Sequence, residues 1–120
     1  MGLYRFLASA RELKEFSNDE KIMKINVIDD LSQISSYTDK KNCAEFKWKY
    51  SEENAQVLIS CIKEHLKICP RIELWNTNID TKKDAIIKKC SKNILTIDKI
   101  RDIWGKESFE QPECLVVYNS

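Results

Sequence analysis

The residues with the clearest chemical potential lie in the segment CIKEHLKICP, which runs from Cys61 to Pro70. This segment holds the only histidine of the chain, His65, with Cys61 four residues before it and Cys69 four residues after it. Residues four apart on a helix lie one above the other, so these three side chains would form one stripe. Thiols and imidazole bind zinc, and a thiol beside an imidazole can become a reactive thiolate. The stripe is therefore a candidate metal or thiol site.

Geometry limits what this stripe can do. On one helix the three side chains span two turns, about 12 Å, which is too far for one tetrahedral ion with bonds of about 2.0–2.3 Å. Cys61 with His65, or His65 with Cys69, would need a second pair from the isolated Cys43, Cys90 or Cys114. A reactive thiol would need a carboxylate to orient the histidine, and the sequence identifies none. We therefore expect no metal and no other cofactor, and interpret the stripe as core packing, because buried free cysteine is common.

The helix that would carry the stripe is predicted by its cap and by its apolar arc. Ser51 occupies an N-cap position, and Glu52 and Glu53 suit the positive end of the helix that follows. We expect this helix to run to about Ile68, because Pro70 disfavours helical backbone in the residue before it. At about 100° per residue its apolar side chains cover roughly half of the circumference; they are Ala55, Val57, Leu58, Ile59, Ile62, Leu66 and Ile68.

Strands and helices follow one another regularly from residue 41 onward. CAEFKWKY alternates apolar and polar residues, which predicts a strand with one buried and one wet face. RIELWNTN and AIIKKCS predict two strands that the turn residues DTKKD would join as a hairpin. Thr96 then caps IDKIRDIW, a short helix that ends at Gly105, and CLVVY predicts a last strand. This β-α-β-β-α-β order predicts an α+β fold, a ferredoxin-like two-layer sandwich, with both helices on one face of the sheet.

The first 40 residues are less regular. LYRFLAS and KIMKINVID predict two additional strands, Ser9 and Glu12 have the spacing of a capping box for a short helical turn, and DDLSQISSYTDKKN predicts a loop. We expect one domain over residues 1–120, in which residues 41–120 form the core and the two N-terminal strands extend or cover a sheet edge. The alternative is an α+β sandwich in which the first 40 residues pair inside the sheet.

Composition excludes several classes of function. Twenty basic residues oppose nineteen acidic ones, and this net charge of +1 predicts no general affinity for nucleic acid. No segment resembles a signal peptide or a membrane span, and the five cysteines form no CxxC pair, so we expect a cytoplasmic protein with reduced thiols. Two glycines leave no room for a phosphate-binding loop, and HExxH and GxSxG are absent. These absences argue against an enzyme.

The wet face of the predicted sheet is the candidate binding surface. Lys47, Lys49, Trp75 and Tyr118 would lie on it, and tryptophan is enriched where proteins bind one another. These four residues are the predicted partner-binding site, for a protein partner or a second copy of the chain. An open sheet with aromatics and lysines is also typical of single-stranded RNA binding, but the glycine-bearing RNP1 pattern is absent. Trp75 could instead pack under the N-terminal segment.

Several segments resemble a family of small bacterial proteins of unknown function. They are LYRFLASARELKE, FKWKYSEENAQVLISCIKEHL, IELWNTNID, LTIDKI and FEQPECLVVYN. The resemblance implies a stand-alone bacterial cytosolic protein and transfers no functional residue. Frequent lysine, isoleucine and asparagine indicate an AT-rich (low-GC) genome. Together these features predict a non-enzymatic protein-interaction or regulatory module, of which a protein that neutralises a partner (an immunity-type protein) is one form. The alternatives are a metal- or thiol-dependent protein and an RNA-binding protein.

Overall fold

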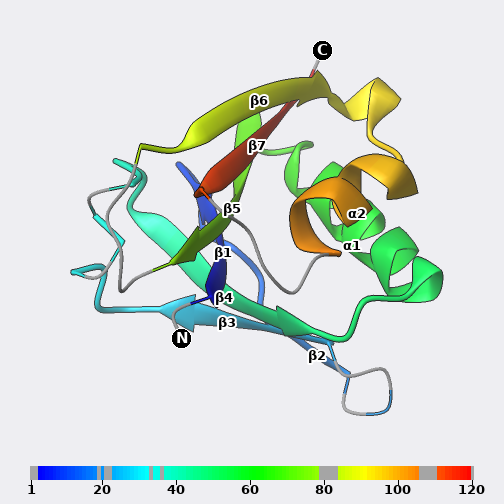
Figure 1. Cartoon of the computed structure of the whole chain (residues 1–120), viewed down its shortest axis with the longest axis horizontal. Helices are drawn as coiled ribbons and strands as arrows, with labels where there is room; N and C mark the ends of the chain where they lie inside the picture. The colour runs from blue at the N-terminus through cyan, green and yellow to red at the C-terminus, as the bar shows by residue number, and fades with distance from the viewer. Residues whose placement is uncertain are drawn as a thin grey trace.

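The structure of the chain, a computed structural model, describes residues 3–18, 20, 23–32, 34–35, 37–78, 84–105 and 111–119. The described residues form one seven-stranded sheet and two α-helices (Figure 1). The strands are β1 (Leu3–Ser9), β2 (Phe16–Asn18), β3 (Met23–Ile28), β4 (Asn42–Trp48), β5 (Arg71–Asn78), β6 (Ile86–Ser91) and β7 (Glu113–Tyr118). The helices are α1 (Glu52–His65), α2 (Ile97–Trp104) and a 3₁₀ turn at Lys92–Ile94. None of the described helices is long and apolar enough to cross a membrane.

The strand order is β2-β3-β4-β1-β5-β7-β6, with β6 and β7 parallel and every other neighbouring pair antiparallel. The α+β class agrees with the sequence, but the number and order of strands differ from the ferredoxin-like layout. The predicted hairpin between β5 and β6 is wrong, because β7 lies between them. In Figure 1, β6 and β2 are the two edges of the sheet.

Strand β1 is in the middle of the sheet, where the alternative interpretation put it, and not at an edge. It pairs with β4 on one side and with β5 on the other. The physical reason is that Phe6, Leu7 and Ala8 are consecutive and all buried, so both faces of the strand need cover. A continuous apolar run of this kind is typical of a central strand. Of the two predicted N-terminal strands only β3 lies toward an edge, as expected; the edge itself is β2, at residues 16–18, which the sequence did not predict, and the helical turn predicted just before it is absent from the described residues.

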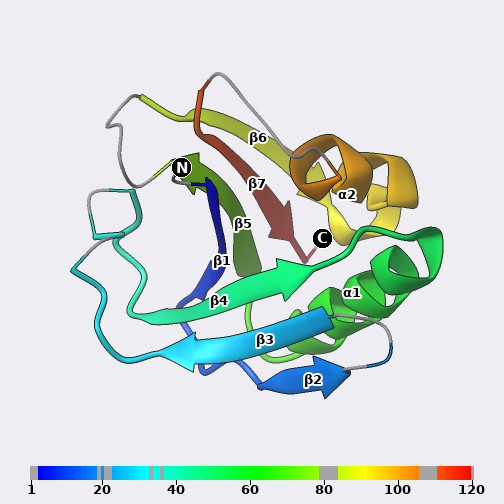
Figure 2. The same cartoon turned by 60° about the horizontal axis from the view of Figure 1, so that its bottom comes forward.

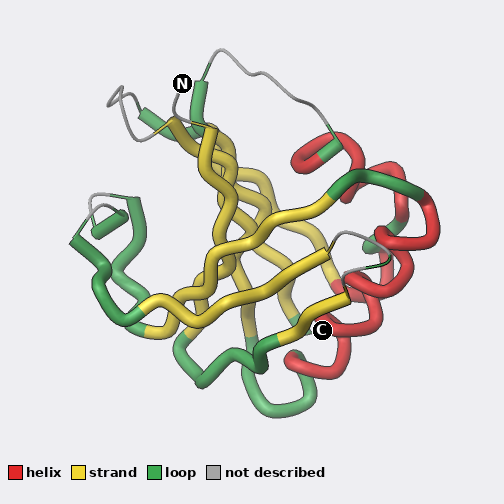
Figure 3. The backbone as a smooth tube through the Cα atoms, turned by 90° about the horizontal axis from the view of Figure 1, so that it is seen from below, coloured by secondary structure: helices red, strands yellow, loops and turns green. Residues whose placement is uncertain are grey.

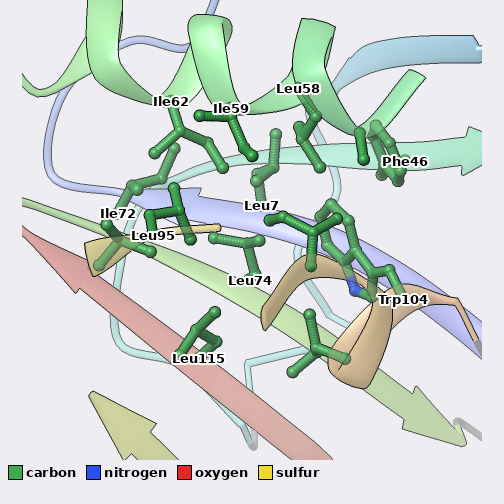
Figure 4. Packing of buried hydrophobic residues seen from close by; sticks show 14 of the residues in the cluster. Leu7, Phe46, Leu58, Ile59, Ile62, Ile72, Leu74, Leu95, Trp104 and Leu115 are labelled. Carbon is green, nitrogen blue, oxygen red and sulfur yellow. The ribbon is translucent and has the colours of Figure 1, made fainter. Parts of the chain in front are cut away.

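Both helices cover one face of the sheet, as the sequence predicts (Figures 2 and 3). Figure 4 shows the core between them and the strands. Leu7 of β1 and Leu74 of β5 lie at its centre, with Leu58 and Ile62 of α1 above them. Burial of each such side chain contributes about 1.5–3 kcal/mol of hydrophobic free energy. This first face of the sheet therefore holds the main core of the protein.

The opposite face, predicted to be wet, carries a second buried cluster. Phe6, Ala8, Cys43, Trp75 and Cys114 form it on the sheet. Leu31, Ile34 and Tyr37 pack against this cluster. They belong to the predicted loop, whose described residues make two turns in which Ile34 is buried and Thr38 donates a hydrogen bond of 2.7 Å to Glu73. The apolar residues Leu31, Ile34 and Tyr37 recur at every third position. This pattern is too sparse to predict from the sequence that the segment covers a face of the sheet.

Trp104 anchors α2 to the sheet by packing and by hydrogen bonds. Its ring stacks on Phe46 with 4.3 Å between centroids, and its Nε1–H donates to the carbonyl of Trp75 at 3.0 Å. In return, the indole N–H of Trp48 donates to the carbonyl of Trp104 at 3.0 Å. Trp104 therefore combines complete burial with satisfied polar groups, which a smaller residue could not reproduce.

Replacement of Trp104 by alanine should lower the free energy of unfolding by about 3–5 kcal/mol, because it opens a large cavity and removes the hydrogen bond from the indole to the Trp75 carbonyl. Urea denaturation followed by circular dichroism measures this change. The control is Ile94→Ala, at a residue 53% exposed, which should change stability by no more than about 0.5 kcal/mol. Equal losses in the two variants would contradict this role of Trp104.

Candidate functional site

Helix α1 positions the histidine, and its two ends are well defined. The hydroxyl of Ser51 accepts a hydrogen bond from the Asn54 backbone at 3.0 Å, which confirms the predicted N-cap. The helix ends at His65, before the predicted Ile68. Asn119 holds this end in place, because its side-chain amide donates to the Leu66 carbonyl at 2.7 Å and its backbone N–H donates to the Pro70 carbonyl at 2.9 Å.

The early end of α1 breaks the predicted stripe. Cys61 and His65 share one turn of helix, but Cys69 lies beyond the helix, just before β5. Cys69 instead approaches a residue from the other end of the sequence: the Oγ atom of Ser9, at the end of β1, lies 3.4 Å from its Sγ atom. The same Oγ lies 2.6 Å from Nε2 of His65. Ser9 therefore joins His65 and Cys69 into one cluster.

We assign the protons of this cluster by taking all three of its side-chain contacts as hydrogen bonds, because the hydrogen positions themselves follow from the network. The thiol of Cys69 has one proton, and it is directed to the carbonyl of Arg71 at 3.2 Å. The hydroxyl of Ser9 accepts from the backbone N–H of Arg11 at 3.2 Å and can then donate its own proton to Cys69. For the 2.6 Å contact to be a hydrogen bond as well, Nε2 of His65 must carry a proton. The resulting chain runs from His65 through Ser9 and Cys69 to Arg71, and leaves Nδ1 of His65 as an acceptor.

Burial and hydrogen bonding set the ionisation of these groups. Burial lowers the pKa of His65 below its ordinary value, so the ring is neutral near neutral pH. Burial alone would raise the pKa of Cys69, but hydrogen bonds from Ser9 and from the backbone of residues 71, 10 and 11 outweigh this effect and lower it. Burial raises the pKa of Cys61.

These features argue against covalent chemistry at the cluster. Cys69 has the favourable pKa but is only 4% exposed, and Ser9 is only 1% exposed. Cys61 is half-buried and thus more accessible, but its raised pKa disfavours the thiolate that would attack a substrate. Among the described residues, no three His, Cys, Asp or Glu side chains are grouped so that they could hold a metal ion.

A pocket of about 550 Å³ lies beside the cluster and is lined by His65 and Cys61. Its wall is mostly aliphatic, and the side chains come from α1, β1, β3 and β5. The segment that leads into β2 closes it with Leu13 and Phe16. This volume is in the range of small-molecule sites, about 300–1,000 Å³. The sequence shows the apolar arc of α1, but it does not show that residues 12–16 stand away from the helix and leave a space.

The four residues of the predicted partner-binding site do not form one surface. Trp75 is only 3% exposed, so the expectation that it lies on an open face is wrong; its ring stacks on Phe6 with 5.8 Å between centroids and packs in one cluster with Ile34 and Tyr37. Lys47 and Lys49 are exposed near the end of β4, whereas Tyr118 is half-buried on β7. Three strand spacings, about 14 Å, separate β4 from β7. Because Trp75 is covered, it is also not available to stack on an RNA base.

Strand β6 has a surface that the sequence analysis did not single out. Ile86 is 41% exposed and Ile87 is 58% exposed, and the following Lys88 and Lys89 are exposed as well. Among the described strands β6 pairs only with β7, so its other edge is open. In the sequence, this surface corresponds to the apolar pair in AIIKKCS, a segment predicted to form a hairpin with β5.

Comparison with known proteins supplies no further guide to this site. No protein-family model matches the chain, and neither the curated proteins nor the solved structures include a significant match. The resemblance to small bacterial proteins therefore stays a prediction.

Titration of His65 should make stability depend on pH in a defined direction. Since the pKa of His65 is lower in the folded than in the unfolded protein, the unfolded chain binds more protons between the two values. The stabilisation is thus complete above about pH 7.5 and falls as the pH drops through about 6.5 and below. Urea denaturation at several pH values, with His65→Gln as the reference, measures this loss. Parallel curves for the wild type and the variant from pH 7.5 to 5 would contradict it.

Proposed function

We propose that this protein is a non-enzymatic interaction module that binds a partner protein by adding a strand to the open edge of β6. The observation that carries the proposal is the exposure of Ile86 and Ile87 on this edge. An open edge presents unpaired backbone donors and acceptors, and an added strand satisfies them while its side chains cover the exposed apolar residues. The other edge, β2, has only three residues and offers much less backbone to a partner.

Charge favours a different protein over a second copy as the partner. In the antiparallel registers that pair most of β6 with another β6, the two copies share the same sheet faces, so either Lys88 or Lys89 lies directly opposite its own counterpart. Like charges directly opposite each other destabilise a strand pair. A strand with acidic residues at these positions would form favourable cross-strand pairs instead. The proposed partner is therefore a protein with an acidic edge strand or extended segment.

The sequence of β6 also defines the pattern of the partner strand. Ile86 and Lys88 lie on the face covered by the helices, and Ile87 and Lys89 lie on the opposite face, because side chains alternate along a strand. An antiparallel partner should thus carry two acidic residues followed by two β-branched apolar residues. A cytoplasmic regulatory or immunity-type protein, which acts by covering a surface of its partner, would bind in this way.

A peptide that contains Glu-Glu-Val-Val between threonines tests this proposal, with Lys-Lys-Val-Val as the comparison peptide. The acidic peptide should slow amide hydrogen exchange across residues 86–91, and its binding should weaken as salt is added. The basic peptide should have no such effect. Hydrogen exchange read by NMR, together with titration calorimetry, gives both results.

Two variants with matched chemistry serve as test and control. Ile87→Glu should weaken binding of the acidic peptide by about tenfold or more, because it removes an apolar contact and adds a like charge. Ile94→Glu, at a residue of similar exposure in the 3₁₀ turn, should leave binding unchanged. Equal effects of the two variants, or the absence of binding by both peptides, would refute the proposal.

A further inference from the structure

The pocket beside α1 has the walls of a site for an aliphatic chain. Leu7 of β1, Ile25 of β3 and Ile72 of β5 line it from the sheet, and Leu58 and Ile62 line it from the helix. Phe16 and the imidazole of His65 are the aromatic rings among the described lining residues, and His65 is engaged with Ser9. Flat ring systems are usually held by aromatic stacking, for which this largely apolar wall offers Phe16 as its one large hydrophobic ring. The wall therefore fits a flexible hydrocarbon chain better than a planar ring.

Between the apolar side chains, the imidazole of His65 presents a polar atom to the pocket that selects the head group of a ligand. The hydrogen-bond chain through Ser9 places the proton of the neutral His65 ring on Nε2 and leaves Nδ1 with a lone pair. None of the described residues donates a hydrogen bond to Nδ1. A half-buried acceptor that lacks a partner favours a ligand that donates. An alcohol or an amine can donate, whereas a carboxylate would place its own lone pairs against Nδ1.

The charges around the pocket favour a cation. Three carboxylates, those of Glu12, Glu15 and Glu64, outnumber the ammonium groups of Lys14 and Lys67 by one. Glu64 already pairs with Lys67 at 3.0 Å, and Glu15 accepts a hydrogen bond from the Val27 backbone at 3.1 Å. Glu12 and Lys14 have no ion-pair partner in the described part of the chain, so with Glu15 they leave the lining with one carboxylate in excess, which is available to a cationic ligand.

We propose that this pocket binds a small aliphatic amine. The hydrocarbon chain lies against Leu7, Leu58 and Ile62, and the ammonium group donates to Nδ1 of His65 on the side that carries Glu12. Ser9 acts as a positioning residue, because it holds the ring in the tautomer that leaves Nδ1 as the acceptor. This site does not depend on the proposed function of β6, since no residue of β6 lines the pocket.

Three ligands with the same chain and different head groups test the proposal: octylamine, 1-octanol and octanoate. Titration followed by the methyl NMR signals of Leu7, Leu58 and Ile62 should show saturable shifts, with the signal of Ile87 as an internal control. The amine should bind about tenfold or more tightly than octanoate, with octanol between them. Octanoate binding as tightly as the amine, shifts at Ile87 alone, or no saturable binding by the amine would overturn the proposal.

Variants distinguish the contribution of the Glu12 charge to ligand binding from that of the hydrogen bond to His65. Glu12→Gln should weaken binding of octylamine severalfold and leave octanol unaffected, whereas Asp102→Asn, an exposed carboxylate on α2 outside the pocket, should change neither. His65→Phe, which keeps a ring but removes the acceptor, should weaken both octylamine and octanol. His65→Gln, which keeps an acceptor, serves if the Phe variant does not fold, and should retain part of the affinity. Equal loss of octanol binding in Glu12→Gln would contradict the assigned role of its charge.

Discussion

The burial of β1 on both of its faces is the constraint on which the rest of the structure depends. Phe6 and Ala8 face one cluster of apolar residues and Leu7 faces the other, so neither face of this strand can remain in water. Cover on the first face comes from α1 and α2, and on the second from Leu31, Ile34 and Tyr37. The position of β1 between β4 and β5 makes one sheet of the N-terminal and C-terminal strands. A ferredoxin-like arrangement of residues 41–120 has no place for such a strand, which explains why the actual order differs.

The end of β1 also creates the polar cluster. Ser9 is the last residue of the strand, and the end of α1 brings His65 to within 2.6 Å of it. A histidine in an apolar arc would be destabilising if both of its nitrogens lacked partners, and Ser9 satisfies one of them. The other nitrogen, Nδ1, is left for a ligand, because the imidazole ring lines the pocket. One nitrogen of His65 is thus hydrogen-bonded inside the protein, and the other can bond to a ligand. This arrangement fits a binding site better than a catalytic one.

The two proposed sites lie on different parts of the sheet and rely on different physics. The pocket is built from β1, β3, β5 and α1, and it selects a ligand by shape and by one hydrogen-bond acceptor. The edge of β6 selects a partner by backbone pairing and by the charges of Lys88 and Lys89. Neither site needs a reactive side chain. Both are therefore consistent with a module that binds and regulates, and a ligand in the pocket would leave the β6 edge free for a partner.

Most of the local elements of this protein are indicated by its sequence alone, with the exceptions of β2 and the exact end of α1. Alternation in CAEFKWKY defines β4, the cap at Ser51 begins α1, and IDKIRDIW before Gly105 defines α2. In each case the signal lies within a few residues, because periodicity and capping are local properties. Only the tertiary structure decided that β1 is central, that β7 separates β5 from β6, and that Cys69 leaves the helix to meet Ser9. Strand pairing and the contact between Ser9 and His65 join residues that are far apart in the chain, and local patterns do not specify which distant segments will meet.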